Sequence, residues 1–177
     1  HVAPTDAALH IDADGVRCVP GKSGRALDVE ATMDTVTTAL SKGAAEVELE
    51  TVVLPPDLPE PQPGCEHAQA LLSRPFVLSA DDPLTHYQAQ FEVPEGQLTT
   101  WLSARKTDDQ VVLEVEEDAV ETWLLGVAGQ LGAERILDSE ETLRRILVAL
   151  REGEHEARCA IQHPDHTYVV EPGDTLF

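Results

Sequence analysis

The feature that most constrains the fold is an internal repeat. Residues 21–43 and 129–153 each contain a Gly-x-x-Gly pair, a Leu-Asp dipeptide followed by an acidic residue and a threonine, an Ala-Leu pair and a closing glycine. From Arg25, which matches Arg135, to the closing glycines the two segments stay a constant 110 positions apart. Such a register is seldom accidental, so we expect two copies of one substructure.

Each copy predicts a capped amphipathic helix. Asp28 and Asp138 stand at the N-cap, where a carboxylate accepts free backbone N–H groups, and Asp138 with Glu141 fits a capping box. Gly43 and Gly153 stand where a left-handed residue ends a helix. Apolar residues form one stripe along each helix: Val29, Met33, Val36 and Leu40 in the first copy, and Leu143, Ile146, Leu147 and Leu150 in the second.

A strand is expected after each helix. In the first copy Val47, Leu49 and Thr51 alternate with glutamates, which predicts one buried face and one face in solvent. Cys159 and Ile161 continue the second copy with a weaker alternation. The repeat therefore predicts two related helix-strand substructures.

The rest of the chain completes an α+β class, with small mixed or antiparallel sheets packed by amphipathic helices. A hairpin is expected at 9–18, helices at 66–73, 98–102 and 120–127, and strands at 87–93 and 111–115. Five prolines between 55 and 63 indicate a linker. The expected domains are a first repeat at 1–60, a linker at 61–64, a second repeat at 65–166 and a separate C-terminal segment at 167–177.

Charge excludes several partners. The 33 acidic and 12 basic residues give a net charge of −21, spread along the chain. This surface repels phosphate backbones and anionic lipids, so nucleic-acid binding is not expected. No stretch approaches the roughly 20 apolar residues of a membrane span. The chain starts at His1 without an initiating Met, so we expect it to be cut from a longer protein, with any targeting segment outside it.

No catalytic centre is expected. None of the six serines stands in a GxSxG or SxxK frame, and the cysteines lack the setting of a transpeptidase nucleophile. The only metal-like spacing is that of His163 and His166, where Pro164 prevents a helical HxxH pair and no third ligand is nearby. We therefore expect no catalytic residues, no metal and no cofactor.

The two tryptophans are the candidate ligand-binding residues. Trp101 and Trp123 both fit the apolar stripe of an expected helix, which favours positions in the core. The alternative is that an exposed indole ring stacks on a sugar. A groove lined by exposed aromatic rings would favour binding, whereas buried tryptophans and an acidic surface would favour a spacer.

Three cysteines allow at most one disulfide. Cys18, Cys65 and Cys159 are widely spaced and form no CxxC pair. Cys18 and Cys159 fall in strand-like segments, so buried unpaired thiols are the favoured interpretation for all three. The redox compartment stays open on this evidence.

The C-terminal segment resembles the start of a LysM domain. Tyr168-Val169-Val170 and Gly173-Asp174-Thr175-Leu176-Phe177 match its opening strand and turn. LysM domains bind glycans that contain N-acetylglucosamine, which in bacteria implies peptidoglycan. The chain ends before the LysM helices, so it does not complete such a site.

Most of the remaining chain resembles the peptidoglycan-binding domains found in tandem beside L,D-transpeptidase domains and in vancomycin-resistance W-type proteins. The resemblance rests on the order of a helix at 68–72, Arg74-Pro75-Phe76-Val77-Leu78, a short helix ending in Trp101-Leu102, a strand at 111–115 and the repeated Leu-Asp helix. The first copy lacks the front half. Residues 1–60 are then either the tail of one repeat or part of the fold of the next.

These resemblances imply a non-catalytic, extracytoplasmic module of the bacterial cell wall. It would either bind peptidoglycan or act as a spacer between wall-binding and catalytic domains. The alternative is an accessory domain that helps to position the substrate of an L,D-transpeptidase or a hydrolase. The resemblance carries no binding residues over to this chain.

Overall fold

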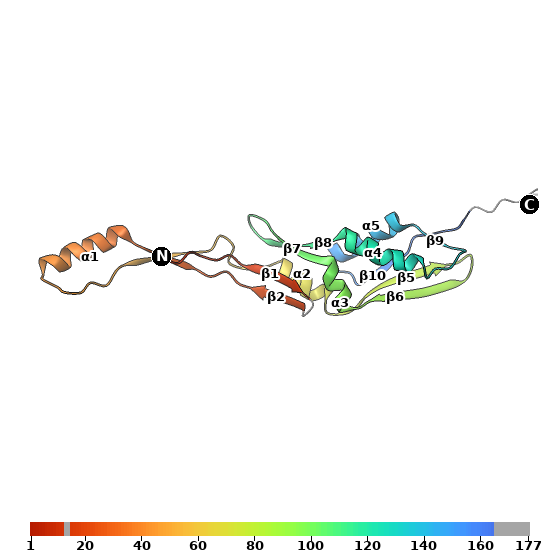
Figure 1. Cartoon of the computed structure of the whole chain (residues 1–177), viewed down its shortest axis with the longest axis horizontal. Helices are drawn as coiled ribbons and strands as arrows, with labels where there is room; N and C mark the ends of the chain where they lie inside the picture. The colour runs from red at the N-terminus through yellow and green to blue at the C-terminus, as the bar shows by residue number, and fades with distance from the viewer. Residues whose placement is uncertain (13–14, 165–177) are drawn as a thin grey trace, which may run out of the picture. The chain divides into compact units, whose positions relative to one another are not determined.

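A computed structural model describes residues 1–12 and 15–164 (Figure 1). The chain divides into two compact units. Unit 1 contains residues 1–74 and 94–116, and unit 2 contains residues 75–93 and those from 117 onward. Short helices and small sheets alternate along both, which confirms the expected α+β class. No helix of the described residues has the length and apolar character of a membrane span.

Unit 1 holds three antiparallel strand pairs and four short helical segments. The pairs are β1 (Ala8–Asp12) with β2 (Gly15–Val19), β3 (Gly24–Leu27) with β4 (Thr51–Leu54), and β7 (Leu102–Lys106) with β8 (Val111–Val115). The helices are α1 (Val29–Ser41), α2 (Gly64–Leu71), α3 (Glu95–Leu98) and the 3-10 turn η1 (Thr99–Trp101). The hairpin expected at 9–18 is confirmed by the antiparallel pairing of β1 with β2, and residues 13–14 lie outside the described residues.

One buried cluster of unit 1 involves α2, β1 and β8. Its buried members are Ala7, Leu9, Leu58, Cys65, Ala68 and Val111. Leu58 belongs to the proline-rich stretch that was expected as a linker. Its backbone N–H donates to Asp6 Oδ1 at 3.0 Å, and its carbonyl accepts from the Ala7 N–H at 2.8 Å. The middle of this stretch is therefore anchored to unit 1.

A disulfide joins Cys18 of β2 to Cys65 of α2. The expectation of three unpaired thiols was therefore wrong for these two residues. They are 47 positions apart, and only the packing of α2 on β2 brings their Cα atoms to 6.0 Å, which no local pattern reveals. Cys159 of unit 2 is a free, buried thiol.

Unit 2 is built on a three-stranded sheet in the order β10 (Glu156–Arg158), β5 (Phe76–Asp82), β6 (Tyr87–Val93). β5 is antiparallel to β6 and parallel to β10. A second pair, β9 (Ile136–Leu137) with β11 (Ile161–Gln162), is antiparallel. The helices are α4 (Glu117–Ala128) and α5 (Ser139–Glu152), and α5 packs on both α4 and β10.

The two repeated segments form related strand–helix–strand motifs, here called motif 1 (residues 24–54) and motif 2 (residues 136–162). Leu27 pairs with Thr51 in motif 1, and Leu137 pairs with Ile161 in motif 2, so each partner shifts by the same 110 positions. The N–H of Asp28 donates to the Glu50 carbonyl at 2.9 Å, and the N–H of Asp138 donates to the Ala160 carbonyl at 2.9 Å.

The helix ends of the two motifs also correspond. Asp28 Oδ1 accepts from the Ala31 N–H at 3.0 Å, and Asp138 Oδ1 accepts from the Glu141 N–H at 3.0 Å. Both helices are followed by a glycine with positive φ, 69° at Gly43 and 76° at Gly153. The predicted N-caps and stops are therefore confirmed in both copies. The capping box of Asp138 with Glu141 was wrong, because the Asp138 N–H donates to the Ala160 carbonyl and the Glu141 carboxylate accepts from Arg144 and Arg145.

The motifs differ in what covers them. The apolar stripe of α5 is buried, whereas the stripe of α1 is largely exposed. The strand expected around Val47 and Leu49 was wrong, because the structure assigns a strand only from Thr51. The corresponding segment of motif 2 is β10, which is held as a strand by its neighbour β5.

Candidate functional site

The outer face of the β10–β5–β6 sheet is polar. Along β5 the buried residues Phe76, Leu78 and Ala80 alternate with more exposed ones, because successive side chains of a strand point to opposite faces. The same alternation holds in β6 and β10. It directs one set of side chains away from the core: Ser79, Asp81, Gln88, Gln90, Glu156 and Arg158.

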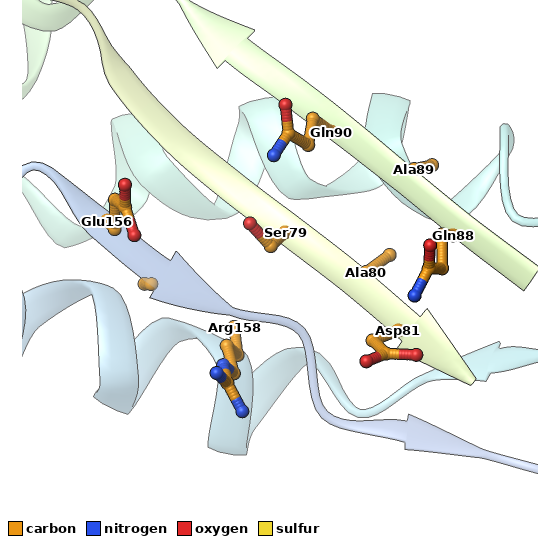
Figure 2. A pocket seen from close by; sticks show the side chains of 9 residues that line it. Ser79, Ala80, Asp81, Gln88, Ala89, Gln90, Glu156 and Arg158 are labelled. Carbon is orange, nitrogen blue, oxygen red and sulfur yellow. The ribbon is translucent and has the colours of Figure 1, made fainter. Parts of the chain in front are cut away.

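These side chains surround a shallow hollow of about 630 Å³ (Figure 2). Strand register places Ser79 opposite Gln90 on one side and Arg158 on the other. Asp81 lies opposite Gln88. On this face the middle strand contributes the short side chain of Ser79, whereas longer side chains extend from its neighbours, among them Gln90 and Arg158. The hollow results from this difference in length.

The polar groups of the hollow are available to a ligand. Within the described residues, none of the six side chains makes a hydrogen bond or ion pair with another side chain. They offer two amides, one hydroxyl, one guanidinium and two carboxylates. Such a set can donate to and accept from hydroxyl and acetamido groups, and the guanidinium of Arg158 can bind a carboxylate.

A second hollow of about 400 Å³ lies beside the edge strand β6. It is lined by Phe91 and Glu92 of β6 and by Trp123, Gly126, Val127 and Gln130 of α4 and its end. Gln90 lines both hollows. Among the described residues outside α4, no atom lies within 4 Å of the position that a Gly126 side chain would take, and Gly126 lines this hollow together with Trp123.

The two candidate tryptophans are placed differently. Trp101 is fully buried in unit 1, so its ring offers no face to solvent. Its backbone carbonyl accepts from the Glu116 N–H at 2.7 Å. Trp123 is half-buried and lines the hollow beside β6. The structure does not bring the two rings to one site within a unit, and ligand contact by either stays a prediction.

A buried ionic network lies at the C-terminal end of β5, directly after the residues that line the hollow. Asp82 accepts from Arg135 Nε at 3.0 Å, and its Oδ1 lies 3.1 Å from His163 Nε2. The pKa of Asp82 is lowered to about 2, first by the Thr85 hydroxyl and then by the Leu84 N–H, Arg135 and His163. Both carboxylate oxygens are thus engaged inside the protein.

Of the metal-like pair His163 and His166, only His163 lies within the described residues. The second ring nitrogen of His163 lies 3.1 Å from the Glu134 carbonyl, so both ring nitrogens have protein partners. His166 lies outside the described residues. Residues 1–12 and 15–164 contain no group of three side chains placed to hold a metal ion.

Sequence reasoning missed the polar sheet face, although part of its signal is visible. Gln88, Gln90 and Glu92 alternate with the apolar positions of their strand, so their outward direction can be read from the sequence. Glu156 and Arg158 join them only through the parallel pairing of β10 with β5. That pairing links distant segments and leaves no local signal.

Comparison with known families gives one match. Residues 1–48, which include β1, β2, β3 and α1 of unit 1, match a family described as "Putative peptidoglycan binding domain". The match covers 48 of 177 residues and leaves the rest of the chain unassigned. Comparisons with curated proteins and with solved structures found no match.

The LysM resemblance stays a prediction. Residues 167–177 lie outside the described residues, and the family comparison gives this segment no support. The peptidoglycan-binding resemblance agrees with the match for its N-terminal part.

Proposed function

We propose that this chain is a non-catalytic, extracytoplasmic module of the bacterial cell wall that contacts peptidoglycan. The observation that carries the proposal is the match of residues 1–48 to a peptidoglycan-binding domain family. The Cys18–Cys65 disulfide supports it, because such bonds persist mainly in oxidising compartments outside the cytoplasm.

The internal repeat extends this proposal to unit 2. Motif 2 reproduces the strand register, the N-cap bond and the closing glycine of motif 1. We infer that the two motifs derive from tandem copies of one domain type. If so, the peptidoglycan-binding assignment of motif 1 extends to motif 2, which the family match does not cover. A LysM domain would then begin at residue 167.

The polar face of the β10–β5–β6 sheet is the surface that we assign to glycan contact. Its side chains face solvent, and among residues 1–12 and 15–164 they form no side-chain hydrogen bond or ion pair with one another or with other side chains. Hydroxyl and acetamido groups of a polysaccharide need many weak polar partners more than they need a single charge. An open hollow also suits a long polymer, which cannot enter a closed cavity.

A second candidate function is that of a spacer or an accessory domain that positions the substrate of a wall enzyme. The fully buried ring of Trp101 favours it, because one of the two candidate ligand-binding tryptophans is a core residue in this structure. The net charge of −21 also favours it, since it opposes close approach to anionic wall polymers.

A glycan titration separates the two functions. Soluble N-acetylglucosamine tetramer and a muropeptide are added to the labelled 177-residue chain while backbone amide signals are recorded. Binding at the sheet face shifts the signals of Ser79, Gln90 and Arg158, and the variants Gln90→Ala and Arg158→Ala weaken it.

Matched controls are available in unit 1. Gln69→Ala and Arg74→Ala change the same residue types at exposed positions outside residues 1–48 and should leave binding unchanged. If neither glycan shifts any signal, the spacer function is supported and the glycan-contact proposal fails.

A further inference from the structure

The apolar face of α1 is uncovered although the same face of α5 is buried. Met33 and Leu40 are 63% and 72% exposed. Their equivalents in motif 2, Leu143 and Leu150, are 9% and 0% exposed. Figure 1 shows α1, in orange, where the β3–β4 pair of unit 1 ends. Within the described residues, no strand or helix packs on α1 as β10 and α4 pack on α5.

The segment after α1 shows the same difference. In motif 2, β10 pairs in parallel with β5, with Glu156 opposite Val77 and Arg158 opposite Ser79. The equivalent residues 46–48 form no strand. Leu49 is 55% exposed, whereas its equivalent Cys159 is 7% exposed. Motif 1 therefore lacks both the neighbouring strand and the cover over the helix that motif 2 has.

We propose that α1 and residues 46–50, here called the α1 surface, form a docking site for a β-hairpin of a protein partner. Motif 2 supplies the template for the complex. The incoming strand would pair in parallel with residues 46–48, as β5 pairs with β10, and its aliphatic side chains would cover Met33, Val36 and Leu40. Strand addition to an open edge, with apolar pockets beside it, is a general mode of peptide recognition.

Charge defines the partner further. The exposed charges around the α1 surface are carboxylates at Glu30, Asp34, Glu46, Glu48 and Glu50, with Lys42 as the one cation near them in the described sequence. A partner with basic residues at its rim is therefore attracted. A second copy of this chain, with a net charge of −21, is repelled, which disfavours a homodimer through this surface.

The test uses the full chain and synthetic hairpins as probes. One peptide has the sequence of residues 74–93, which contains β5 and β6, and a second carries Gln88→Lys and Gln90→Lys in that sequence. A peptide of the same composition in scrambled order is the control. We expect both hairpins to shift the amide signals of residues 46–50 and α1, with tighter binding by the lysine peptide at low salt.

A matched pair of variants tests the location. Leu40→Asp should weaken peptide binding roughly tenfold or more, because it removes one apolar contact and would bury a carboxylate within an apolar contact surface. Leu125→Asp, at an equally exposed leucine of α4, should have no effect. Circular dichroism checks that the helices persist in both variants.

Three outcomes would overturn the proposal. The first is an absence of shifts at millimolar peptide. The second is a set of shifts confined to unit 2, which would mean that the peptide displaces β5 from its own sheet. The third is sedimentation as a dimer that Leu40→Asp dissociates, because the α1 surface would then bind a second copy.

Discussion

Asp82 and Arg135 form an ion pair that is almost closed to solvent, with 3% and 11% of their side chains exposed. Arg135 Nε donates to Asp82 Oδ2 at 3.0 Å, and the guanidinium carbon lies 4.0 Å from the centre of the Tyr87 ring. The pair therefore connects the segment before β9 with the ends of β5 and β6. It holds the end of the sheet on which the polar hollow is built.

The pH dependence of stability should reveal this network. The pKa of Asp82 is lowered from 3.8 to about 2, so its stabilising contribution is complete above pH 3.8 and disappears as the pH falls through about 2. We expect Asp82→Asn to lower the free energy of unfolding at neutral pH. The difference from the unmodified protein should shrink as the pH falls to about 2.

Urea unfolding curves over this pH range measure the effect. Asp81→Asn, which changes the neighbouring exposed carboxylate, is the control and should alter stability little. A difference between Asp82→Asn and the unmodified protein that stays constant with pH would contradict this account.

Equivalent threonines of the two motifs should differ in their contribution. Thr142 is fully buried, and its hydroxyl accepts from the Ala160 N–H at 2.9 Å. Thr142→Val leaves that N–H without a partner, which should cost about 1–3 kcal/mol. Thr32 is also buried, at 8% exposed, but its hydroxyl only donates to the Glu50 carbonyl at 3.3 Å, and that carbonyl also accepts from the Asp28 N–H at 2.9 Å. Thr32→Val leaves no backbone group without a partner and should therefore cost less. Chemical denaturation of both variants measures the change in the free energy of unfolding. Equal decreases for the two variants would mean that the two threonines are equally important to stability, which would contradict this account.

The disulfide should stabilise unit 1 selectively. Cys18 and Cys65 close a loop with a sequence separation of 47, for which chain entropy predicts a stabilisation of about 4 kcal/mol. We expect the double variant Cys18→Ala, Cys65→Ala to speed hydrogen exchange at core amides of unit 1, such as Leu9 and Ala68. Amides of unit 2, such as Leu78, serve as the internal control. Faster exchange in both units to the same degree would show that they unfold together.

The remaining thiol should be inert in the folded protein. Burial raises the pKa of Cys159 to about 11, so little thiolate forms at neutral pH, and the side chain is 7% exposed. We expect iodoacetamide to modify Cys159 only after unfolding, as followed by mass spectrometry. Ser41→Cys places a thiol at an exposed position and should react at once. Rapid modification of Cys159 without denaturant would show that the end of β10 opens readily.

Local signals predicted much of the fold. The caps at Asp28 and Asp138 and the stops at Gly43 and Gly153 could be read directly, because they depend on residues within one helical turn. Whether the apolar face of α1 is buried could not be read from the sequence. An apolar stripe shows which face a helix would bury but does not show whether a partner is present, and Leu40 is 72% exposed.

Long-range contacts account for what the sequence did not predict. The Cys18–Cys65 bond and the pairing of β10 with β5 each join segments that are distant in the chain. In the candidate site, the outward direction of Gln88 and Gln90 follows from alternation within one strand. The position of Arg158 beside Ser79 depends on that long-range pairing, so it became visible only in the folded chain.

Salt should control any association with intact cell walls. Peptidoglycan that carries wall teichoic acid is polyanionic, and a chain of net charge −21 is repelled from it at 0.01 M salt, where the Debye length is about 30 Å. We expect the 177-residue chain to sediment poorly with decorated sacculi at that salt concentration. Retention should rise near 0.15 M salt, where the Debye length is about 8 Å, and on sacculi stripped of teichoic acid.

The opposite salt dependence would show that an attractive ionic contact dominates. If retention rises on stripped sacculi, Gln90→Ala should reduce it, whereas Gln69→Ala should not. Addition of a complete LysM domain at the C-terminus should restore sedimentation even with decorated sacculi. Strong retention of the unextended chain at low salt, competed by soluble muropeptides, would exclude a pure spacer and require a glycan site whose affinity overcomes the charge.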